Sequence, residues 1–250
     1  MTMFDLTGRR ALITGSTRGI GLALAKGLAA AGARIVLNGR DAGALDIAVT
    51  ALGGGAVGRV FDVTDRQSVA AAIDAIEAEA GPIDILINNA GMQHRTPLED
   101  FPEEVWHRLM RTNLDSAFFV GQAAARHMIR RRRGAIINVG SVQSELGRPG
   151  IAPYAASKGG LKMLTKGMAI DWGKHGIRVN GLSPGYFKTE LNAALVKDAA
   201  FSDWLTRRTP LGRWGDVEEL VGAAVFLASD AASFVTGHML FVDGGVTSML

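Results

Sequence analysis

Short apolar runs, many of them β-branched, recur along the chain and alternate with longer stretches of helical periodicity. The seven runs are Ala11–Thr14, Arg34–Asn38, Val57–Asp62, Asp84–Asn88, Ala135–Val139, Arg178–Leu182 and Met239–Val242. Parallel pairing is expected, because each intervening helix returns the chain to the same end of the sheet. Nearly continuous apolar segments such as Ile83–Ile87 indicate strands covered on both faces. We therefore predict an α/β fold: a doubly wound, parallel, seven-stranded sheet with helices on both faces.

One domain is expected over residues 1–250, because the apolar segments are evenly spread and no linker-like stretch separates them. A single segment, residues 188–213, interrupts the alternation of strands and helices late in the chain. An open α/β sheet has its substrate crevice in this region, so we predict that the segment is a mobile substrate lid.

Two predicted helices have readable ends. Asp216, followed three residues later by Glu219, is the pattern of a capping box ahead of an apolar helix. A long helix is predicted from near Pro102 to Gly134, and its closing basic run, Arg130–Arg133, suits the negative end of the helix dipole. The net charge is only +3 and no stacking aromatic residues accompany the run, so we predict no nucleic-acid partner.

Composition excludes several other classes of protein. The chain has no cysteine, which removes disulfides, thiolate nucleophiles and thiolate metal ligands. Its five histidines lack the paired spacing of metal ligands, so we predict no metal site. The apolar stretches fall short of the roughly 18 residues that suggest a membrane span. The first ten residues lack a signal-like apolar core, and a cytoplasmic location is therefore expected, with no membrane partner.

A glycine-rich turn links the first predicted strand to the first helix, where residues 14–21 read TGSTRGIG. Glycines at such a place allow a tight turn and the close approach of a pyrophosphate to the backbone. The positive end of the helix dipole favours the phosphate charge. The turn therefore predicts a dinucleotide site, with a purely structural strand-to-helix turn as the alternative.

The end of the second strand distinguishes between two forms of the cofactor. NAD-binding proteins have an acid about 20 residues past the glycine turn, whereas this chain has Gly39 followed by Arg40. Arg18 and Arg40 are placed to bind a 2′-phosphate through charge-assisted hydrogen bonds, which favours NADP(H) over NAD. The alternative is that both arginines are solvated surface residues. Asp41 is expected to cap the helix that starts at Ala42.

Tyr154 and Lys158 are four residues apart in a segment of helical composition, so their side chains share one face. We expect the ammonium of Lys158 and the nicotinamide cation to lower the tyrosine pKa, which makes the phenol an efficient acid and base. Ser141 follows the fifth strand, at the ligand-binding edge of such a sheet. Taken singly, a serine after a strand is often a turn residue, and a Tyr/Lys pair is often a surface contact.

The motifs together resemble those of the short-chain dehydrogenase/reductase family, and the resemblance extends over almost the whole chain. It rests on the Thr-Gly-x-x-x-Gly-x-Gly spacing and on Asn88–Gly91, Asn113, Ser141, Tyr154, Lys158, Pro184–Gly185 and Asp243–Gly245. It implies a Rossmann fold, a homotetramer, and an oxidoreductase that moves a hydride between NADP(H) and a secondary carbon. In that family the residue corresponding to Asn113 binds a relay water linked to the lysine. The expected catalytic residues are Asn113, Ser141, Tyr154 and Lys158.

The same resemblance and the glycine turn define the expected cofactor contacts. They are Gly15, Ser16, Thr17, Arg18, Gly19, Ile20, Gly21, Arg40, Asp62, Val63, Asn89, Ala90, Gly91, Tyr154, Lys158, Pro184, Gly185 and Thr189. Asp62 resembles a residue that hydrogen-bonds the adenine, with a simple turn as the alternative. Thr189 resembles a contact to the nicotinamide amide or phosphate, with a cap of the lid helix as the alternative.

The loops around the site, residues 89–95, 142–148 and 184–190, resemble those of family members that interconvert gluconate and 5-ketogluconate, and the resemblance continues through residues 208–210 and 213–215. A sugar acid offers a carboxylate and several hydroxyls, for which the chain provides His94, Arg95, Ser141, Gln143, Glu145 and Tyr154. Arg95 is the expected carboxylate partner, and Arg148 is a further candidate. The alternative substrates are a 3-oxoacyl thioester on a carrier protein and another sugar acid. A nucleotide-sensing protein without catalysis is the alternative from another class.

Overall fold

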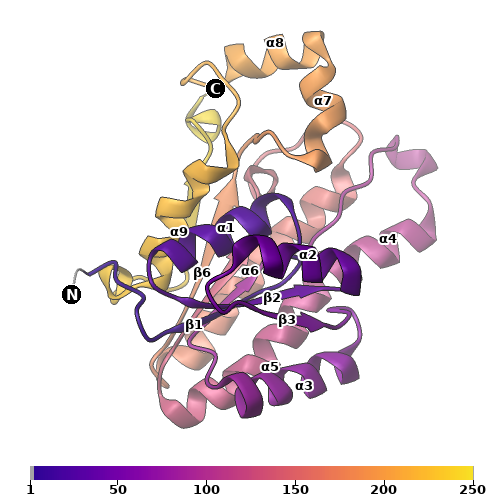
Figure 1. Ribbon diagram of the computed structural model, residues 1–250. Coiled ribbons are helices and arrows are strands. Elements are labelled where there is room, and N and C mark those ends of the chain that lie inside the picture. Colours follow the sequence, from indigo (N-terminus) through magenta and orange to yellow (C-terminus); the bar gives the residue numbers. More distant parts are fainter. Residues whose placement is uncertain (1–2, 250) are drawn as a thin grey trace.

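Seven parallel strands form one sheet in the computed structural model, which describes residues 3–249 without the side chain of residue 191 (Figure 1). Their order in the sheet is β3-β2-β1-β4-β5-β6-β7. The strands are β1 (Arg10–Ile13), β2 (Arg34–Gly39), β3 (Val57–Val60), β4 (Ile85–Asn88), β5 (Gly134–Val139), β6 (Ile177–Pro184) and β7 (Met239–Val242). The predicted fold is confirmed. Because the strand order reverses between β1 and β4, the carboxyl ends of these two strands border a crevice.

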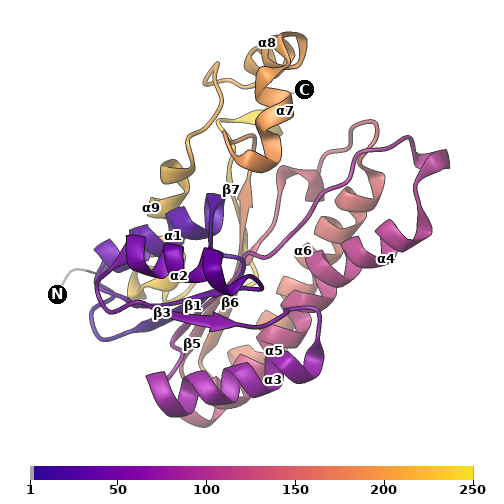
Figure 2. The same cartoon turned by 45° about the vertical axis from the view of Figure 1, so that its right-hand side comes forward.

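Helices cover both faces of the sheet, as Figures 1 and 2 show. One layer contains α1 (Gly19–Ala30), α2 (Ala42–Leu52) and α9 (Val221–Ala228), and the other contains α3 (Arg66–Ala75), α5 (Ser116–Arg131) and α6 (Ala152–Gly173). Strand β1 shows why two cores form: Ala11 and Ile13 pack into the first layer and Leu12 into the second. Alternating side chains of a strand point to opposite faces, so an apolar strand serves both cores.

The predicted long helix is present, with an interruption that the sequence pattern does not reveal. It consists of α4 (Glu103–Met110), a π-helical turn η3 (Arg111–Asp115) and α5. It ends at Arg131, because Arg132 adopts a left-handed conformation with φ of 53°. The basic run lies at this helix end, where Arg131 pairs with Glu77. Gly134, the predicted stop, is the first residue of β5.

Residues 188–213 leave the sheet as predicted and form a helical excursion above it (Figure 1). It contains η5 (Glu190–Asn192), α7 (Ala193–Lys197) and α8 (Ala199–Arg208). Its two ends meet at Gly215, whose amide donates to Tyr186 O at 2.9 Å and whose carbonyl accepts from Lys188 N at 2.9 Å. The chain then enters η6 (Val217–Leu220), where the predicted Asp216–Glu219 capping box is confirmed. We refer to residues 188–213 as the lid, after the role predicted for them from the sequence.

The remaining elements are short. They are the π-turn η1 (Ile76–Ala80) and the 3₁₀ turns η2 (Leu98–Asp100), η4 (Val142–Ser144), η7 (Asp230–Ala232) and η8 (Val246–Ser248). Of these, η4 matters most for the site, because it begins directly after Ser141 at the end of β5.

Candidate active site

The glycine turn between β1 and α1 packs tightly against the loop that follows β4. A side chain at Gly15 would place its Cβ 2.9 Å from Ala90 Cα, and Gly15 has a φ of 59°. Asn89 holds the two segments together, because its Nδ2 donates to the carbonyls of Thr14 and Gly15, both at 2.9 Å. Thr14 Oγ1 in turn accepts from the amides of Asn89 and Ala90. Glycine is therefore required at position 15 for both space and conformation.

The other end of the glycine turn, at the start of α1, is open instead of tightly packed. Gly19 begins α1 with a φ of 55°, and a Cβ there would meet nothing within 4 Å. No side chain caps α1 at Arg18, so the first amides of the helix remain available to an anion. An open cradle before an uncapped helix N-terminus fits the pyrophosphate of a dinucleotide. The donor set thus fits the predicted cofactor.

Arg18 and Arg40 lie at the same end of the sheet, and each has a carboxylate partner. Arg18 Nη1 is 3.3 Å from Glu190 Oε2 in the lid, and Arg40 Nη1 is 3.7 Å from Asp62 Oδ2. Burial favours a higher pKa for Asp62, but the hydrogen bonds from Thr64 and the charge of Arg40 outweigh it and lower that pKa. Because Asp62 Oδ1 also accepts from Thr64 N at 2.8 Å, the turn expected as its alternative role is present.

Position 39 is constrained by its neighbour in the glycine turn. A Cβ at Gly39 would lie 2.7 Å from Thr17 Cγ2, so an acid at this position would require Thr17 to move. Asp41, the acid that follows Arg40, caps α2 by accepting from Ala44 N at 2.8 Å, as predicted. The end of β2 therefore has no room for the acid of NAD-binding proteins unless Thr17 moves.

Tyr154, Lys158 and Ser141 meet at the carboxyl end of β5. Tyr154 and Lys158 lie one turn apart on α6, with Lys158 Nζ 5.8 Å from the centre of the Tyr154 ring. The ammonium donates to Val139 O at 2.7 Å and is 4% exposed. Ser141 shares a hydrogen bond with the Tyr154 phenol, and its Oγ accepts from Gln143 N at 3.1 Å. The three expected side chains form one cluster.

The electrostatics of this cluster differ from the expectation for its tyrosine. Burial raises the pKa of Tyr154, against the hydrogen bond with Ser141 and the positive charge of Arg95. Burial also lowers the pKa of Lys158 to about 8. The prediction that Lys158 lowers the tyrosine pKa does not hold in the protein by itself, because the cation that acts on the phenol is Arg95.

Asn113 lies in the π-turn η3, directly beside the cluster. Its Oδ1 accepts from Met92 N at 2.8 Å, and its Nδ2 donates to Met92 O and to Ser157 Oγ. A Cβ at Gly91 would be 3.5 Å from Asn113 Oδ1 and 3.9 Å from Lys158 Nζ. Asn113 therefore anchors the loop after β4 against α6, next to the buried lysine.

An arginine and a second tyrosine border the cluster. Arg95 Nη2 donates to Gln93 Oε1 at 2.9 Å and to Asn192 Oδ1 of the lid at 3.3 Å. Tyr186, two residues after β6, accepts a hydrogen bond from Gln143 Nε2 at 3.2 Å. Sequence reasoning missed Tyr186. Its position just past the Pro184–Gly185 end of a central strand, at the ligand-binding edge, was the signal available.

Two of the expected substrate contacts have other partners. His94 Nε2 is 2.8 Å from Thr96 Oγ1, and its ring packs edge-on against Phe101. Glu145 forms an ion pair with Lys162 of α6. Both side chains thus help to hold the loops that surround the site.

The remaining expected cofactor residues lie along the same edge of the sheet. Ser16 Oγ links the turn to β2 by accepting from Asn38 N at 3.0 Å, and Ile20 and Val63 pack against the two cores. Gly185 lies against Asp243, with a Cβ there 2.7 Å from Asp243 Cα. Thr189 Oγ1 accepts from Asn192 N at 3.3 Å, so the expected cap of the lid helix is present.

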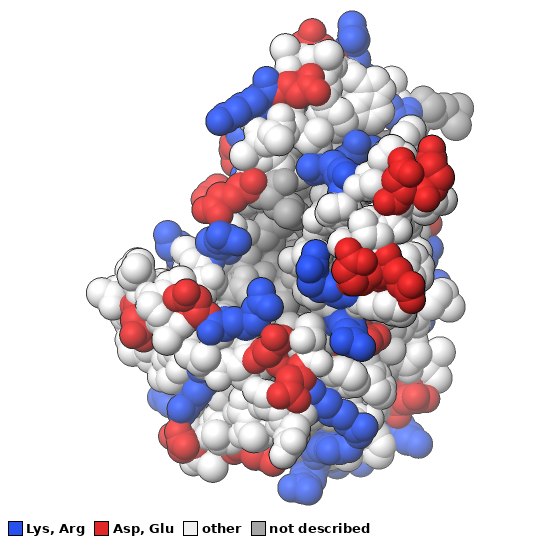
Figure 3. Space-filling model, turned by 90° about the vertical axis from the view of Figure 1, so that its right-hand side faces the viewer, with Lys and Arg blue, Asp and Glu red and all other residues white. Residues whose placement is uncertain are grey.

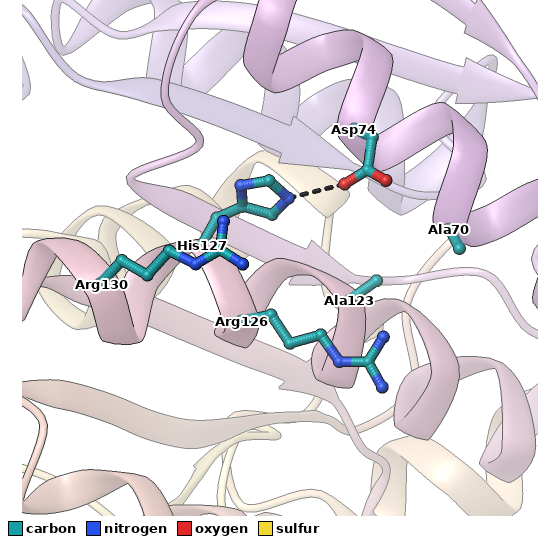
Figure 4. A pocket seen from close by; sticks show the side chains of 6 residues that line it. All are labelled: Ala70, Asp74, Ala123, Arg126, His127 and Arg130. Carbon is teal, nitrogen blue, oxygen red and sulfur yellow. Dashed lines mark hydrogen bonds and ion pairs between the residues drawn. The ribbon is translucent and has the colours of Figure 1, made fainter.

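Figure 3 shows a hollow on one face of the molecule, with lysine and arginine side chains around it. A separate cavity of about 280 Å³ lies between α3 and α5 (Figure 4). It is lined by Ala70, Asp74, Ala123, Arg126, His127 and Arg130, and His127 Nε2 is 2.7 Å from Asp74 Oδ1. None of the expected site residues lines it. Within residues 3–249, no group of three or more His, Asp or Glu side chains is arranged to hold a metal ion.

Fold, glycine turn and the Ser-Tyr-Lys cluster together define a dinucleotide-dependent oxidoreductase, and the chain belongs to the short-chain dehydrogenase/reductase family. Residues 15–247 match the family model described as enoyl-(acyl carrier protein) reductase. No helix in the described part of the chain is both long and apolar enough to cross a membrane.

The chain is similar over almost its whole length to several named oxidoreductases. It is 62% identical to gluconate 5-dehydrogenase of Gluconobacter oxydans, over 99% of this chain and 98% of the relative. It is 52% identical to 5-keto-D-gluconate 5-reductase of Escherichia coli K12, over 98% and 97%. A crystal structure of gluconate 5-dehydrogenase from Burkholderia cenocepacia, in complex with NADP and tartrate, superposes with a TM-score of 0.97 at 62% identity, covering 99% of this chain and 98% of that one.

Proposed function

We propose that this protein is an NADP(H)-dependent oxidoreductase that interconverts gluconate and 5-ketogluconate. The observation that carries the proposal is the 62% identity, over nearly the full length of both chains, to a gluconate 5-dehydrogenase. The meeting of Ser141, Tyr154 and Lys158 beside the glycine turn supplies the chemistry that this reaction needs.

In this proposal Tyr154 is the acid and base. During reduction its phenol donates a proton to the substrate carbonyl oxygen, and during oxidation the phenolate accepts the proton of the hydroxyl. Ser141 holds the substrate oxygen and the phenol in register through its hydroxyl. Lys158, with a pKa of about 8, carries most of its charge at neutral pH, and together with the cation of bound NADP⁺ it would favour the phenolate. Asn113 keeps the loop after β4 against this pair.

NADP(H), when bound, donates or accepts the hydride. The protein would hold it by the uncapped amides of α1 at the pyrophosphate and by Arg18 and Arg40 at the 2′-phosphate. Asp62 and Val63 would border the adenine, and Asn89–Gly91 and Thr189 the nicotinamide half. The remaining glycine-turn residues and Pro184–Gly185 would shape the floor of the site.

For the substrate, Arg95 is the proposed carboxylate partner, with Ser141, Gln143 and Tyr154 at its hydroxyls. His94 and Glu145 would act by holding their loops, since each has a partner there. Residues 188–213 would serve as a lid over the bound substrate, within the single domain of residues 1–250. The contact of Arg95 with Asn192 ties the proposed carboxylate site to that lid.

A homotetramer in the cytoplasm is the proposed state of the chain. On α6, Met163 and Ile170 are 62% and 78% exposed and lie seven residues apart, which places them on one face. Phe118 of the neighbouring α5 is 39% exposed. Such apolar side chains on adjacent helices support self-association. Light scattering after gel filtration would measure the mass, and a monomer at micromolar concentration would contradict the tetramer.

The test of the reaction is NADPH oxidation by the purified protein. We expect turnover of 5-ketogluconate, and of gluconate with NADP⁺ in reverse, at a kcat/KM well above that for other ketones. The panel should include another keto sugar acid and a 3-oxoacyl thioester, because the chain is also 38% identical to the 3-oxoacyl-[acyl-carrier-protein] reductase FabG of E. coli. A higher kcat/KM for either of these would replace the proposed substrate.

A further inference from the structure

A second phenol lies beside the catalytic cluster, at the base of the lid. Tyr186 packs edge-on against Trp214, with ring centres 6.0 Å apart, and its ring also contacts Phe201 of α8 at 5.8 Å. Its hydroxyl accepts the hydrogen bond from Gln143. The rings of Phe201 and Trp214 therefore hold the Tyr186 phenol in a fixed place. A buried tyrosine held in this way presents its hydroxyl for the recognition of a ligand.

Arg148 approaches this hydroxyl from the loop after β5. Its guanidinium carbon lies 5.3 Å from the centre of the Phe201 ring, and its side chain hydrogen-bonds Tyr186. A guanidinium stacked on an aromatic face keeps its in-plane donors free for an anion. Because Phe201 belongs to α8, the lid itself sets the position of Arg148.

Two buried atoms in this group have no hydrogen-bond partner among the described residues: Gln143 Oε1 and Arg148 Nε. Gln143 as a whole is only 8% exposed. Buried polar atoms in folded proteins are nearly always paired, so an unpaired acceptor and an unpaired donor on two residues that both interact with Tyr186 indicate a polar ligand. A hydroxyl satisfies the acceptor, and a carboxylate oxygen satisfies the donor.

The group is also adjacent to the reacting oxygen. Gln143 N donates to Ser141 Oγ, the hydroxyl that hydrogen-bonds the catalytic phenol. The charges of Arg95 and Arg148 both act on Tyr186, and that of Arg95 also acts on Tyr154. A short, acyclic molecule held at Ser141 and Tyr154 would therefore place its far end among these residues.

We propose that Arg148, Gln143 and Tyr186 form a subsite for the carboxylate and neighbouring hydroxyl of an acyclic hydroxy acid. The proposal rests on the proposed sugar-acid reaction and adds Arg148 and Tyr186 to Arg95 as partners of the same carboxylate. Arg148 binds one oxygen of the carboxylate, and the Tyr186 hydroxyl donates a hydrogen bond to the other oxygen. Gln143 Oε1 accepts a hydrogen bond from the neighbouring hydroxyl of the ligand.

Direct binding tests the subsite without relying on turnover. Calorimetry on the complex of the full-length protein with NADPH, which cannot react with either ligand, would compare gluconate with sorbitol, which replaces the carboxylate by a hydroxymethyl group. We expect Arg148→Gln to weaken gluconate binding roughly ten- to a hundredfold. Arg148→Lys should restore part of that loss, and Tyr186→Phe should weaken gluconate binding a few-fold, because its ring packing is kept. Sorbitol binding should change little in all three variants.

Lys197→Gln is the matched control, since it removes an exposed positive charge from the lid outside the subsite. NADP⁺ affinity and the melting temperature would verify that each variant is folded. Unchanged gluconate affinity in Arg148→Gln, or an equal loss in Lys197→Gln, would overturn the proposal. Equal losses for gluconate and sorbitol would assign Arg148 a structural role and overturn it too. Gluconate binding that depends on Arg148 in a protein that does not turn over 5-ketogluconate would retain the subsite and refute the proposed reaction.

Discussion

Arg18 of the glycine turn and Glu190 of the lid form an ion pair that joins the two ends of the candidate site, with Nη1 and Oε2 3.3 Å apart. Their side chains are 76% and 70% exposed. An ion pair this exposed contributes at most about 1 kcal/mol, whereas a phosphate offers a guanidinium stronger, bidentate hydrogen bonds. A 2′-phosphate at Arg18 would therefore displace Glu190.

Replacing Glu190 by Gln should consequently tighten NADPH binding. The carboxylate both competes for Arg18 and repels the phosphate, so we expect the dissociation constant to fall roughly two- to fivefold. NADPH fluorescence titration at low and high salt would measure it, with the gain shrinking at high salt because the charges are exposed. Glu104→Gln, an exposed acid on α4, is the control. A gain for NADH as large as that for NADPH would argue against a phosphate at Arg18.

Gly15 and Gly19 should respond differently to the same substitution. Gly19→Ala adds a methyl group to open space, so we expect a fall in melting temperature of only a few degrees but at least a tenfold loss of NADPH affinity. Gly15→Ala drives its methyl into the Ala90 backbone and should destabilise the fold itself. Thermal denaturation and cofactor titration on both variants separate the two effects. Full NADPH affinity in Gly19→Ala would exclude this cradle as the pyrophosphate site.

Cofactor preference should depend on Arg40. We expect Arg40→Ser to weaken NADPH binding roughly tenfold and NADH binding little, because only the 2′-phosphate contact is lost. Adding Gly39→Asp should bring the preference toward NADH. The new side chain would meet Thr17 Cγ2, so Thr17→Ser in the same protein should improve folding and NADH affinity. An unchanged NADPH to NADH ratio in Arg40→Ser would remove Arg40 from the phosphate site.

The sheet could be predicted from the sequence because its strands are buried on both faces and are therefore apolar along most of their length. The apolar pattern of a run such as Ile83–Ile87 is a local property of the sequence and does not depend on its neighbours in the fold. All seven predicted strands are present, and each end lies within two residues of its predicted position. The sequence also predicted that Tyr154 and Lys158 lie side by side, since residues four apart in a helix share one face.

Features that depend on contacts between distant segments could not be read in this way. The π-turn η3 adds a residue to a helix whose apolar periodicity continues on both sides, so nothing local marks it. The pairing of Glu145 with Lys162 arises only when the loop after β5 packs on α6, and the place of Tyr186 beside Gln143 arises only when the loops after β5 and β6 meet. The effect of burial on Tyr154 could not be predicted for the same reason: in the protein by itself, burial outweighs the neighbouring charges and raises the pKa of the phenol.

Tyr154→Phe should abolish turnover while leaving the cofactor site intact. The phenylalanine keeps the ring and loses the proton donor, and general acid–base groups contribute about 10²–10⁴-fold to rate. We expect kcat to fall by at least about a thousandfold and the NADPH dissociation constant to change less than twofold. Stopped-flow and fluorescence titration measure the two quantities. Activity within tenfold of the unaltered enzyme would assign the acid and base to another group.

Lys158→Met should alter stability in a way that depends on pH. Burial lowers the pKa of Lys158 from 10.5 to about 8, so below pH 8 the folded protein bears the full cost of an ammonium that is 4% exposed. Between pH 8 and 10.5 the folded state releases its proton first, and the free energy of unfolding of the unaltered protein should rise with pH. The methionine side chain carries no charge to bury, so the variant should exceed the unaltered protein in unfolding free energy by most near pH 7.

Urea denaturation at pH 7 and 9.5 would measure this dependence. We expect the difference in unfolding free energy, variant minus unaltered protein, to fall by up to about 2 kcal/mol between these values. Tyr154 does not interfere, because burial raises its pKa and keeps the phenol protonated in this range. Lys166→Met, at an exposed position of the same helix, provides the control and should show a constant difference. A constant difference for Lys158→Met as well would mean that its ammonium is hydrated in the folded protein, and its proposed effect on the phenol would then be weak.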